Sequence, residues 1–128
     1  MQDDQRFTKG MEIRREVLGN EYVDNNSAGS DEFMMTFQRI VTELAWGYAW
    51  NGTALDKKTK SMLSVAILAA SGRFEEVEIY TKGALRMGVT LDELKEILTH
   101  VAVYCGTPAG RQSFLAARKA LQTAEGSK

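Results

Sequence analysis

The stretch TLDELKEILTHVAVYCGTP, residues 90–108, contains the start of one helix, its body, its end and the start of the next helix. Thr90 and Glu93 form the Thr-x-x-Glu pattern of a capping box, in which each side chain bonds the backbone N–H of the other residue. The body carries an apolar stripe at helical spacing, made by Leu94, Ile97, Leu98, Val101 and Cys105. Gly106 favours a helix end, and Pro108 favours the first position of a new helix with Thr107 as its cap.

Helical periodicity continues on both sides of this stretch. We expect helices over about residues 7–18, 31–48, 56–71, 74–87 and 91–105, and a last one from 108 onward with Phe114, Ala117 and Leu121 facing inward. Residues 20–30 are rich in asparagine, serine and glycine, which predicts a loop, and Ser30 is the expected cap of the next helix. That helix carries a second apolar stripe, made by Phe33, Phe37, Ile40, Leu44 and Tyr48.

No strand-like alternation appears, so the predicted fold class is all-α, a compact bundle of about six helices. With 128 residues and 44% hydrophobic content, the chain can bury one core, and we expect a single domain over residues 1–128. A net charge of -1 disfavours nucleic acid and anionic membranes as partners. The single cysteine and the lack of a long apolar run favour a cytoplasmic location.

The first candidate site lies on the flank of the 91–105 helix. His100 and Tyr104 are one helical turn apart and face the same direction. A histidine exchanges protons near neutral pH and a tyrosine donates a hydrogen bond to a developing oxyanion, so the pair suits a pocket for a small acid. The alternative is structural, with His100 in a core or an interface and Tyr104 as a packing residue. Cys105 is interpreted as a small hydrophobic residue of the stripe.

The second candidate site combines aromatic rings and cations. The sequence WGYAW at 46–50 places Trp46 and Tyr48 near the end of a predicted helix, and the basic run KKTK at 57–60, with Lys58, follows. These residues can wall and charge an anion pocket; the alternative is ordinary packing of the rings and solvation of the lysines. Arg111, in the first turn of the last predicted helix, either clamps a carboxylate or points to water.

Several familiar site types are absent from the sequence. It has no Cys-x-x-Cys pair, no histidine pair for zinc, no Gly-x-x-x-x-Gly-Lys phosphate loop and no Gly-x-Ser-x-Gly nucleophile elbow. Metal, nucleotide and thiol-redox chemistry therefore lose support, and we expect no cofactor.

Several further motifs occur in a fixed order along nearly the whole chain. GMEIRREVLG at 10–19 is followed by AWG at 45–47, by Trp50, and by LDKKTKS at 55–61. GVT at 88–90, the acidic residues Asp92, Glu93 and Glu96, and YCGTPA at 104–109 complete the series. The first motif is similar to the pattern Gly-Met-x-x-Arg-Arg-x-Val-Leu-Gly, and 55–61 corresponds to a stretch usually rich in arginine. With these motifs the chain resembles the carboxymuconolactone decarboxylase family.

The resemblance implies an all-α, carboxymuconolactone-decarboxylase-like subunit of a homo-oligomer, a trimer or a hexamer, with sites near the subunit contacts. It also implies a cofactor-free lyase of the β-ketoadipate route of aromatic catabolism. Such a lyase converts 4-carboxymuconolactone to 3-oxoadipate enol-lactone and carbon dioxide. The expected partner is thus a small organic acid or lactone.

Two positions depart from the family pattern. Family decarboxylases usually carry a histidine four residues after a glutamate in the fourth predicted helix, but here Glu76 is followed at that spacing by Tyr80. Tyr48 stands where an acidic residue often follows Trp-Gly. The resemblance makes Tyr80 and His100 the candidates for proton handling or oxyanion binding. The predicted substrate-binding residues around them are Trp46, Tyr48, Lys58, Tyr104 and Arg111. The alternatives are a family member acting on another lactone or β-keto acid, and a non-catalytic ligand-binding subunit.

Overall fold

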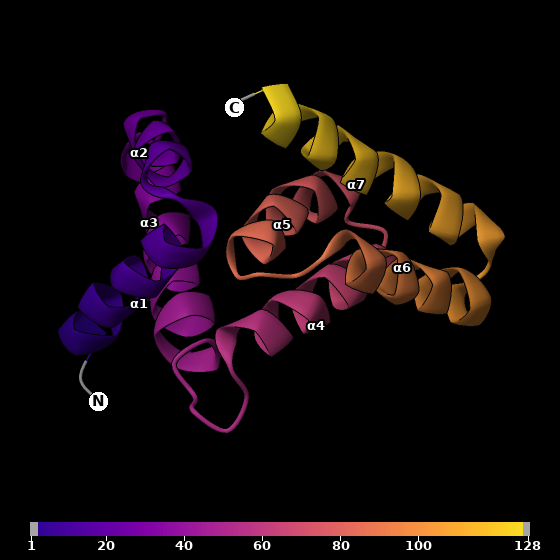
Figure 1. The fold of residues 1–128 in the computed structure, drawn as a ribbon. Helices are drawn as coiled ribbons and strands as arrows, with labels where there is room; N and C mark the ends of the chain where they lie inside the picture. The colour runs from indigo at the N-terminus through magenta and orange to yellow at the C-terminus, as the bar shows by residue number, and fades with distance from the viewer. Residues whose placement is uncertain (1–2, 127–128) are drawn as a thin grey trace. The chain divides into compact units, whose positions relative to one another are not determined.

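A computed structural model describes residues 3–126, and over this range the chain forms seven α-helices, one π-helical segment and no strand (Figure 1). The predicted all-α fold class is therefore confirmed. The chain divides after Asp56 into two compact units, and the expected single domain stays a prediction. The N-terminal unit contains α1 (Asp3–Leu18), α2 (Asn20–Ala28), α3 (Glu32–Ile40) and the π-helical segment η1 (Val41–Ala49). The C-terminal unit contains α4 (Lys57–Ala70), α5 (Phe74–Arg86), α6 (Leu91–Cys105) and α7 (Thr107–Gly126).

The N-terminal unit is built on the packing of α1 against η1. Its buried apolar side chains come from α1, α2, η1 and the residue after η1, and are Ile13, Val17, Leu18, Val23, Trp46 and Trp50. Arg14 is also buried, and its guanidinium donates to Gln38 Oε1 at 2.9 Å and to Thr42 Oγ1 at 3.5 Å. A cation is thus held inside a small unit by polar groups of α3 and η1, which ties these segments to α1.

The predicted loop at residues 20–30 is wrong, because residues Asn20–Ala28 form the helix α2. Gly19, with a φ of 91°, lets the chain end α1 and start α2 at once, and Val23 is fully buried on the inner face. Burial of one side chain therefore outweighs the local turn preference of the asparagines. Ser30 is not the cap of α3. The Asp31 carboxylate accepts from the Met34 N–H at 2.9 Å, and the Ser30 hydroxyl donates to the Asn26 carbonyl.

The apolar stripe expected on the helix over 31–48 faces outward. Its exposure runs from 51% at Ile40 to 84% at Phe33, with the other members between these values. The buried side chains of α3 and η1 are instead Gln38, Thr42 and Trp46, which are spaced four residues apart on the other face. The Trp50 N–H donates to the Ala45 carbonyl at 2.9 Å, the five-residue spacing of a π-helix.

In the C-terminal unit, α4 packs against α5 and α6, and α7 packs against α5 and α6 (Figure 1). The core is made by small and branched side chains of all four helices, among them Val65, Ala69, Val77, Ala84, Leu94, Leu98, Val101, Ala116 and Ala117. The predicted helices over 56–71, 74–87 and 91–105 are confirmed within one residue at each end. Gly72, Gly88 and Gly106 have positive φ, as expected for residues that follow a helix.

The last helix differs in two details from its prediction. It begins at Thr107, so Pro108 occupies the second helical position and Thr107 is inside the helix rather than its cap. Phe114 is 41% exposed, whereas Ala117 is buried and Leu121 packs against the core as predicted. The helix begins one residue earlier than predicted because the Gly110 N–H donates to the Gly106 carbonyl, and this bond brings Thr107 into the first turn. Between residues 3 and 126, no helix is long and apolar enough to cross a membrane.

Candidate functional site

A groove with a volume of about 610 Å³ lies between α4 and α6 in the C-terminal unit. Its walls are mainly apolar and its polar groups come mostly from α6. It is lined by Thr59, Met62, Leu63, Ala66 and Ala70 from α4, and by Glu96, Ile97, His100, Val101, Tyr104 and Cys105 from α6. A volume of several hundred Å³ with few polar groups is typical of a small-molecule site. We call this hollow the histidine groove.

His100 and Tyr104 lie together in the histidine groove, as their spacing predicts. Their ring centroids are 5.2 Å apart and the ring planes meet at 32°. The capping box at Thr90 and Glu93 starts α6 in the register that buries Leu94 and Leu98, and this register turns position 100 toward α4. The imidazole and the phenol are both exposed, so each can reach a molecule in the groove.

Two further residues of the histidine groove were not recognised as site residues from the sequence. Glu96 precedes His100 by one turn, so a carboxylate, an imidazole and a phenol occupy one face of α6. That four-residue spacing is the signal that could have found it. Cys105, expected within the buried stripe, is exposed at the end of the groove, so this part of the prediction is wrong. The stripe ends at Val101 because α6 ends four residues later.

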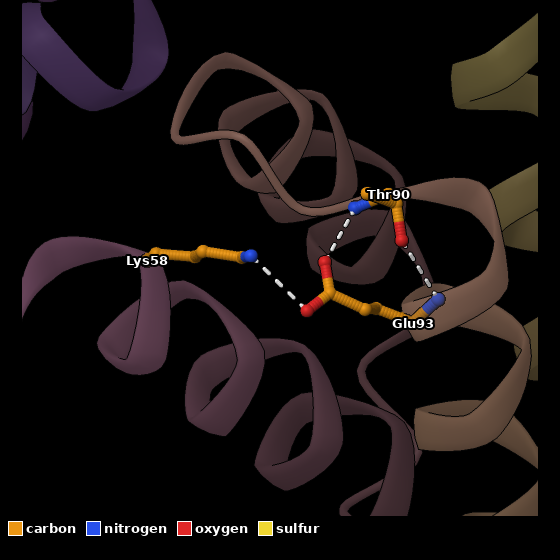
Figure 2. Close-up of polar contacts among 3 residues, drawn as sticks. All are labelled: Lys58, Thr90 and Glu93. Carbon is orange, nitrogen blue, oxygen red and sulfur yellow. Dashed lines mark hydrogen bonds and ion pairs between the residues drawn. The ribbon is translucent and has the colours of Figure 1, made fainter.

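Lys58 does not line either hollow. It forms an ion pair with Glu93, a residue of the capping box at the start of α6. Its Nζ lies 3.1 Å from Glu93 Oε2 (Figure 2). The other carboxylate oxygen of Glu93 accepts from the Thr90 N–H at 2.9 Å, and the Glu93 N–H donates to Thr90 Oγ1 at 3.1 Å. The predicted capping box is thus confirmed, and Lys58 links α4 to the start of α6. The backbone N–H of Thr90 and the hydrogen bond from Lys58 lower the pKa of Glu93 below its ordinary value.

We expect Glu93→Gln to lower the melting temperature at about pH 7 by a small amount that shrinks as the pH falls below the ordinary pKa of a glutamate, about 4.3. Glutamine keeps the acceptor of a capping box, so the variant removes only the charge that faces Lys58. A carboxyl whose pKa is lowered on folding stabilises the protein above its unfolded-state pKa. This stabilisation is lost as the pH falls through the folded-state pKa. Melting curves of both proteins across this pH range test it.

Glu96→Gln on the same helix is the matched control, because no ion pair of Glu96 is seen in the described part of the chain. Its difference from the unmodified protein should change little over the same pH range. A Glu93→Gln difference that stays constant with pH would contradict the role of the charge.

Arg111 is not in the histidine groove. It lines a second hollow of about 390 Å³ between α6 and α7, on the other flank of α6. The two hollows share no residue of α6. The histidine groove is lined by α6 residues between positions 96 and 105, and the second hollow by residues between positions 91 and 98 on another face of the helix. The structure therefore separates Arg111 from His100 and Tyr104, which the sequence prediction grouped around one substrate.

Tyr80 lines neither hollow. It lies on α5, is partly buried, and packs against the core of the C-terminal unit. Neither hollow takes a lining residue from α5, so the structure does not group Tyr80 with His100 and Tyr104. The catalytic role that the resemblance implies for Tyr80 stays a prediction.

Trp46 and Tyr48 belong to the N-terminal unit. The Trp46 side chain is 1% exposed and stacks on Trp50, with ring centroids 4.8 Å apart. Tyr48 is 68% exposed, and the Arg6 guanidinium lies 5.6 Å from its ring centroid. The two predicted pocket residues thus differ in surroundings, since Trp46 is a core residue of its unit and Tyr48 is a surface residue. Their predicted contact with substrate stays a prediction.

The fold is all-α, and the histidine groove has the volume and the mainly apolar lining that are typical of small-molecule sites. A model of the carboxymuconolactone decarboxylase family matches residues 36–119. The chain belongs to this family. It is 38% identical over 109 residues to 4-carboxymuconolactone decarboxylase of Acinetobacter baylyi, and this aligned region covers 85% of this chain and 81% of the relative. It is 36% identical over 115 residues to nitrosuccinic acid decarboxylase of Metarhizium robertsii, and this aligned region covers 90% of this chain and 80% of the relative.

Proposed function

We propose that the protein is a cofactor-free decarboxylase of a small organic acid, with 4-carboxymuconolactone as its substrate. The product would be 3-oxoadipate enol-lactone, in the β-ketoadipate route of aromatic catabolism. The observation that carries the proposal is the match over most of the chain to two relatives that are both decarboxylases. The histidine groove supports it, because it joins an apolar wall to an imidazole and a phenol.

The substrates in the names of the two relatives share one kind of electron flow. In each, the bond to the departing carboxylate breaks, carbon dioxide leaves, and the electron pair moves onto oxygen of an acceptor. The acceptor is the conjugated lactone carbonyl in one acid and the nitro group in the other. A proton then returns to the product. The enzyme has to favour the loss of charge from the carboxylate, stabilise the new oxyanion and supply this proton.

The histidine groove offers a group for each of these tasks. The apolar side chains of Met62, Leu63 and Ile97 solvate a carboxylate poorly and neutral carbon dioxide well, which favours the step. The Tyr104 hydroxyl can donate a hydrogen bond to the oxyanion. The His100 imidazolium can donate the proton, and the water outside the open groove can restore it.

Incubation of the purified protein with 4-carboxymuconolactone is expected to release carbon dioxide and to remove the absorbance of the conjugated lactone. Nitrosuccinate is the parallel substrate, since its decarboxylation needs the same three tasks with a different acceptor. Turnover of the lactone at a higher kcat/KM than nitrosuccinate would support the assignment. Turnover of neither acid above an empty-vector control would contradict it.

A second candidate function is the decarboxylation, isomerisation or hydrolysis of a different lactone or β-keto acid. It is favoured by Tyr80, which stands four residues after Glu76 where the family pattern has a histidine. A phenol is a poor proton donor to carbon at neutral pH but a good hydrogen-bond donor. For such an acid, Tyr80→Phe should lower the rate at least about tenfold. A non-catalytic ligand-binding subunit would instead show ligand-induced thermal stabilisation without product.

We also propose that the protein works as a homo-oligomer, a trimer or a hexamer, in the cytoplasm. The exposed stripe on α3 and η1 supports association, because Phe33, Phe37 and Leu44 are each more than half exposed. Sedimentation at micromolar concentration tests this, and a species of monomer mass alone would contradict it.

A further inference from the structure

The hollow between α6 and α7 has a composition unlike that of the histidine groove. Seven of its ten lining residues are apolar and the other three are cations, with no acidic residue among them. The apolar residues are Leu91, Leu94, Leu98, Phe114, Leu115, Ala117 and Leu121, and the cations are Lys95, Arg111 and Arg118. The whole chain carries a net charge of -1, so the positive charge is concentrated locally. We call this hollow the arginine groove.

The cations of the arginine groove have few internal counter-ions. Within the part of the chain that the structure describes, neither Arg111 nor Arg118 forms an ion pair. Lys95 lies 3.9 Å from Asp92 on its own helix, and both side chains are largely exposed. Such a pair on the surface is weak and easily exchanged. Three cations around one apolar surface therefore have unused capacity to bind an anion.

The arrangement on α7 fits an elongated ligand. Arg111 and Arg118 are seven residues apart, which puts them two turns apart on one face and about 10 Å apart along the helix. Phe114 lies between them on the same face. The buried side chains of Leu94, Leu98 and Ala117 form the floor of the groove. A volume of about 390 Å³ lies in the range of small-molecule sites.

We propose that the arginine groove is a second binding site, separate from the histidine groove, for an organic monoanion with a linear apolar tail. The carboxylate pairs with the guanidinium of Arg111 or Arg118, whose planar fork matches its two oxygens. The tail covers the floor of the groove and removes it from water. A medium-chain fatty carboxylate has both parts. The inference uses only the shape and charge of this groove and does not depend on the proposed decarboxylation.

The charge pattern favours this occupant over others. A polyanion such as a nucleotide would satisfy the guanidinium groups but leave the leucine floor exposed to water. A neutral apolar molecule would cover the floor but leave the cations unpaired. Of these three ligand classes, the one with an anionic end and an apolar body is the one that pairs with a guanidinium group and also covers the floor.

Titration of the full-length protein with decanoate, followed by calorimetry and by NMR of the α6 and α7 amides, tests the proposal. Saturable binding at one site per chain is expected, with the largest shifts around Leu98 and Phe114. Decan-1-ol, which lacks the charge, and butyrate, which lacks the tail, should each bind at least about tenfold more weakly. Raising the salt concentration should weaken the binding of decanoate and leave the binding of decan-1-ol unaffected, because salt screens the ion pair with the carboxylate.

The double variant Arg111→Gln/Arg118→Gln should weaken decanoate binding at least about tenfold and leave decan-1-ol unchanged. Both arginines are exposed, so the fold should be retained, which circular dichroism checks. Lys119→Gln is the matched control, because Lys119 is an exposed cation of α7 that does not line the groove. Its effect on decanoate should be less than about twofold.

Three results would overturn the proposal. One is the absence of saturable binding at millimolar decanoate. Another is equal weakening by the double variant and by Lys119→Gln, which would indicate a general charge effect. The third is hydrogen-exchange protection of the α6 and α7 amides that rises with protein concentration, together with a loss of decanoate binding at the same concentrations. This result would mean that a second copy of the chain covers the groove.

Discussion

Replacing His100 with glutamine is expected to lower kcat for decarboxylation by about 100-fold or more, the usual effect of removing a general acid. Glutamine keeps a polar side chain that can donate a hydrogen bond, but it cannot transfer a proton near neutral pH. His100 is exposed on α6 and lies outside the core, so the variant should fold as well as the unmodified protein. Steady-state rates with 4-carboxymuconolactone, together with a melting curve, measure both effects.

Matched variants separate this role from a general disturbance of α6. Thr99→Ala changes the neighbouring exposed residue, which does not line the histidine groove, and it should leave kcat within about twofold. Tyr104→Phe removes only a hydroxyl and should lower kcat by about tenfold if that hydroxyl binds the oxyanion. If His100→Gln is fully active while Tyr80→Phe is not, the chemistry takes place on the face of α5 and the assignment to the histidine groove is wrong.

The helices of the C-terminal unit could be predicted from the sequence because their signals are local. The capping box at Thr90 and the glycines at 72, 88 and 106 act through bonds and dihedral angles within a few residues. The N-terminal unit shows where such signals fail. α2 forms because Val23 is buried by α1 and its neighbours, and burial depends on contacts that no short window of sequence contains.

The candidate site could be predicted to a similar extent and for the same reason. His100 and Tyr104 share a helix, so their spacing alone brings them together. Arg111 lies on another helix, and its side of α6 depends on how α7 packs against α6. Lys58 was recognised as a cation near the site, but its pairing with Glu93 depends on the approach of α4 to the start of α6. Residues from different helices need tertiary packing before they can be grouped.

The packing of α1 against η1 depends on two glycines, so Gly47→Ala is expected to destabilise the N-terminal unit strongly. A Cβ atom at position 47 would lie 2.3 Å from the carbonyl oxygen of Arg6, and one at Gly10 would lie 2.1 Å from that of Thr42. Both obstacles are backbone atoms of the partner segment, which cannot rotate away as a side chain can. The segments would have to separate, and Trp46 and Ile13 would lose buried contacts. We expect a loss of about 3 kcal/mol in the free energy of unfolding, at the upper end for overpacking.

Urea denaturation can assign this loss to the N-terminal unit, because both tryptophans of the chain, Trp46 and Trp50, are buried there. Their fluorescence follows this unit, whereas far-UV circular dichroism follows the helices of both. Gly29→Ala is the matched control: Gly29 has a φ of -83°, and the nearest atom to its Cβ would be 3.6 Å away, an ordinary contact. It should change stability by less than about 1 kcal/mol, because alanine fits this conformation. If Gly47→Ala unfolds no more readily than Gly29→Ala, the close approach of α1 to η1 is not what stabilises this unit.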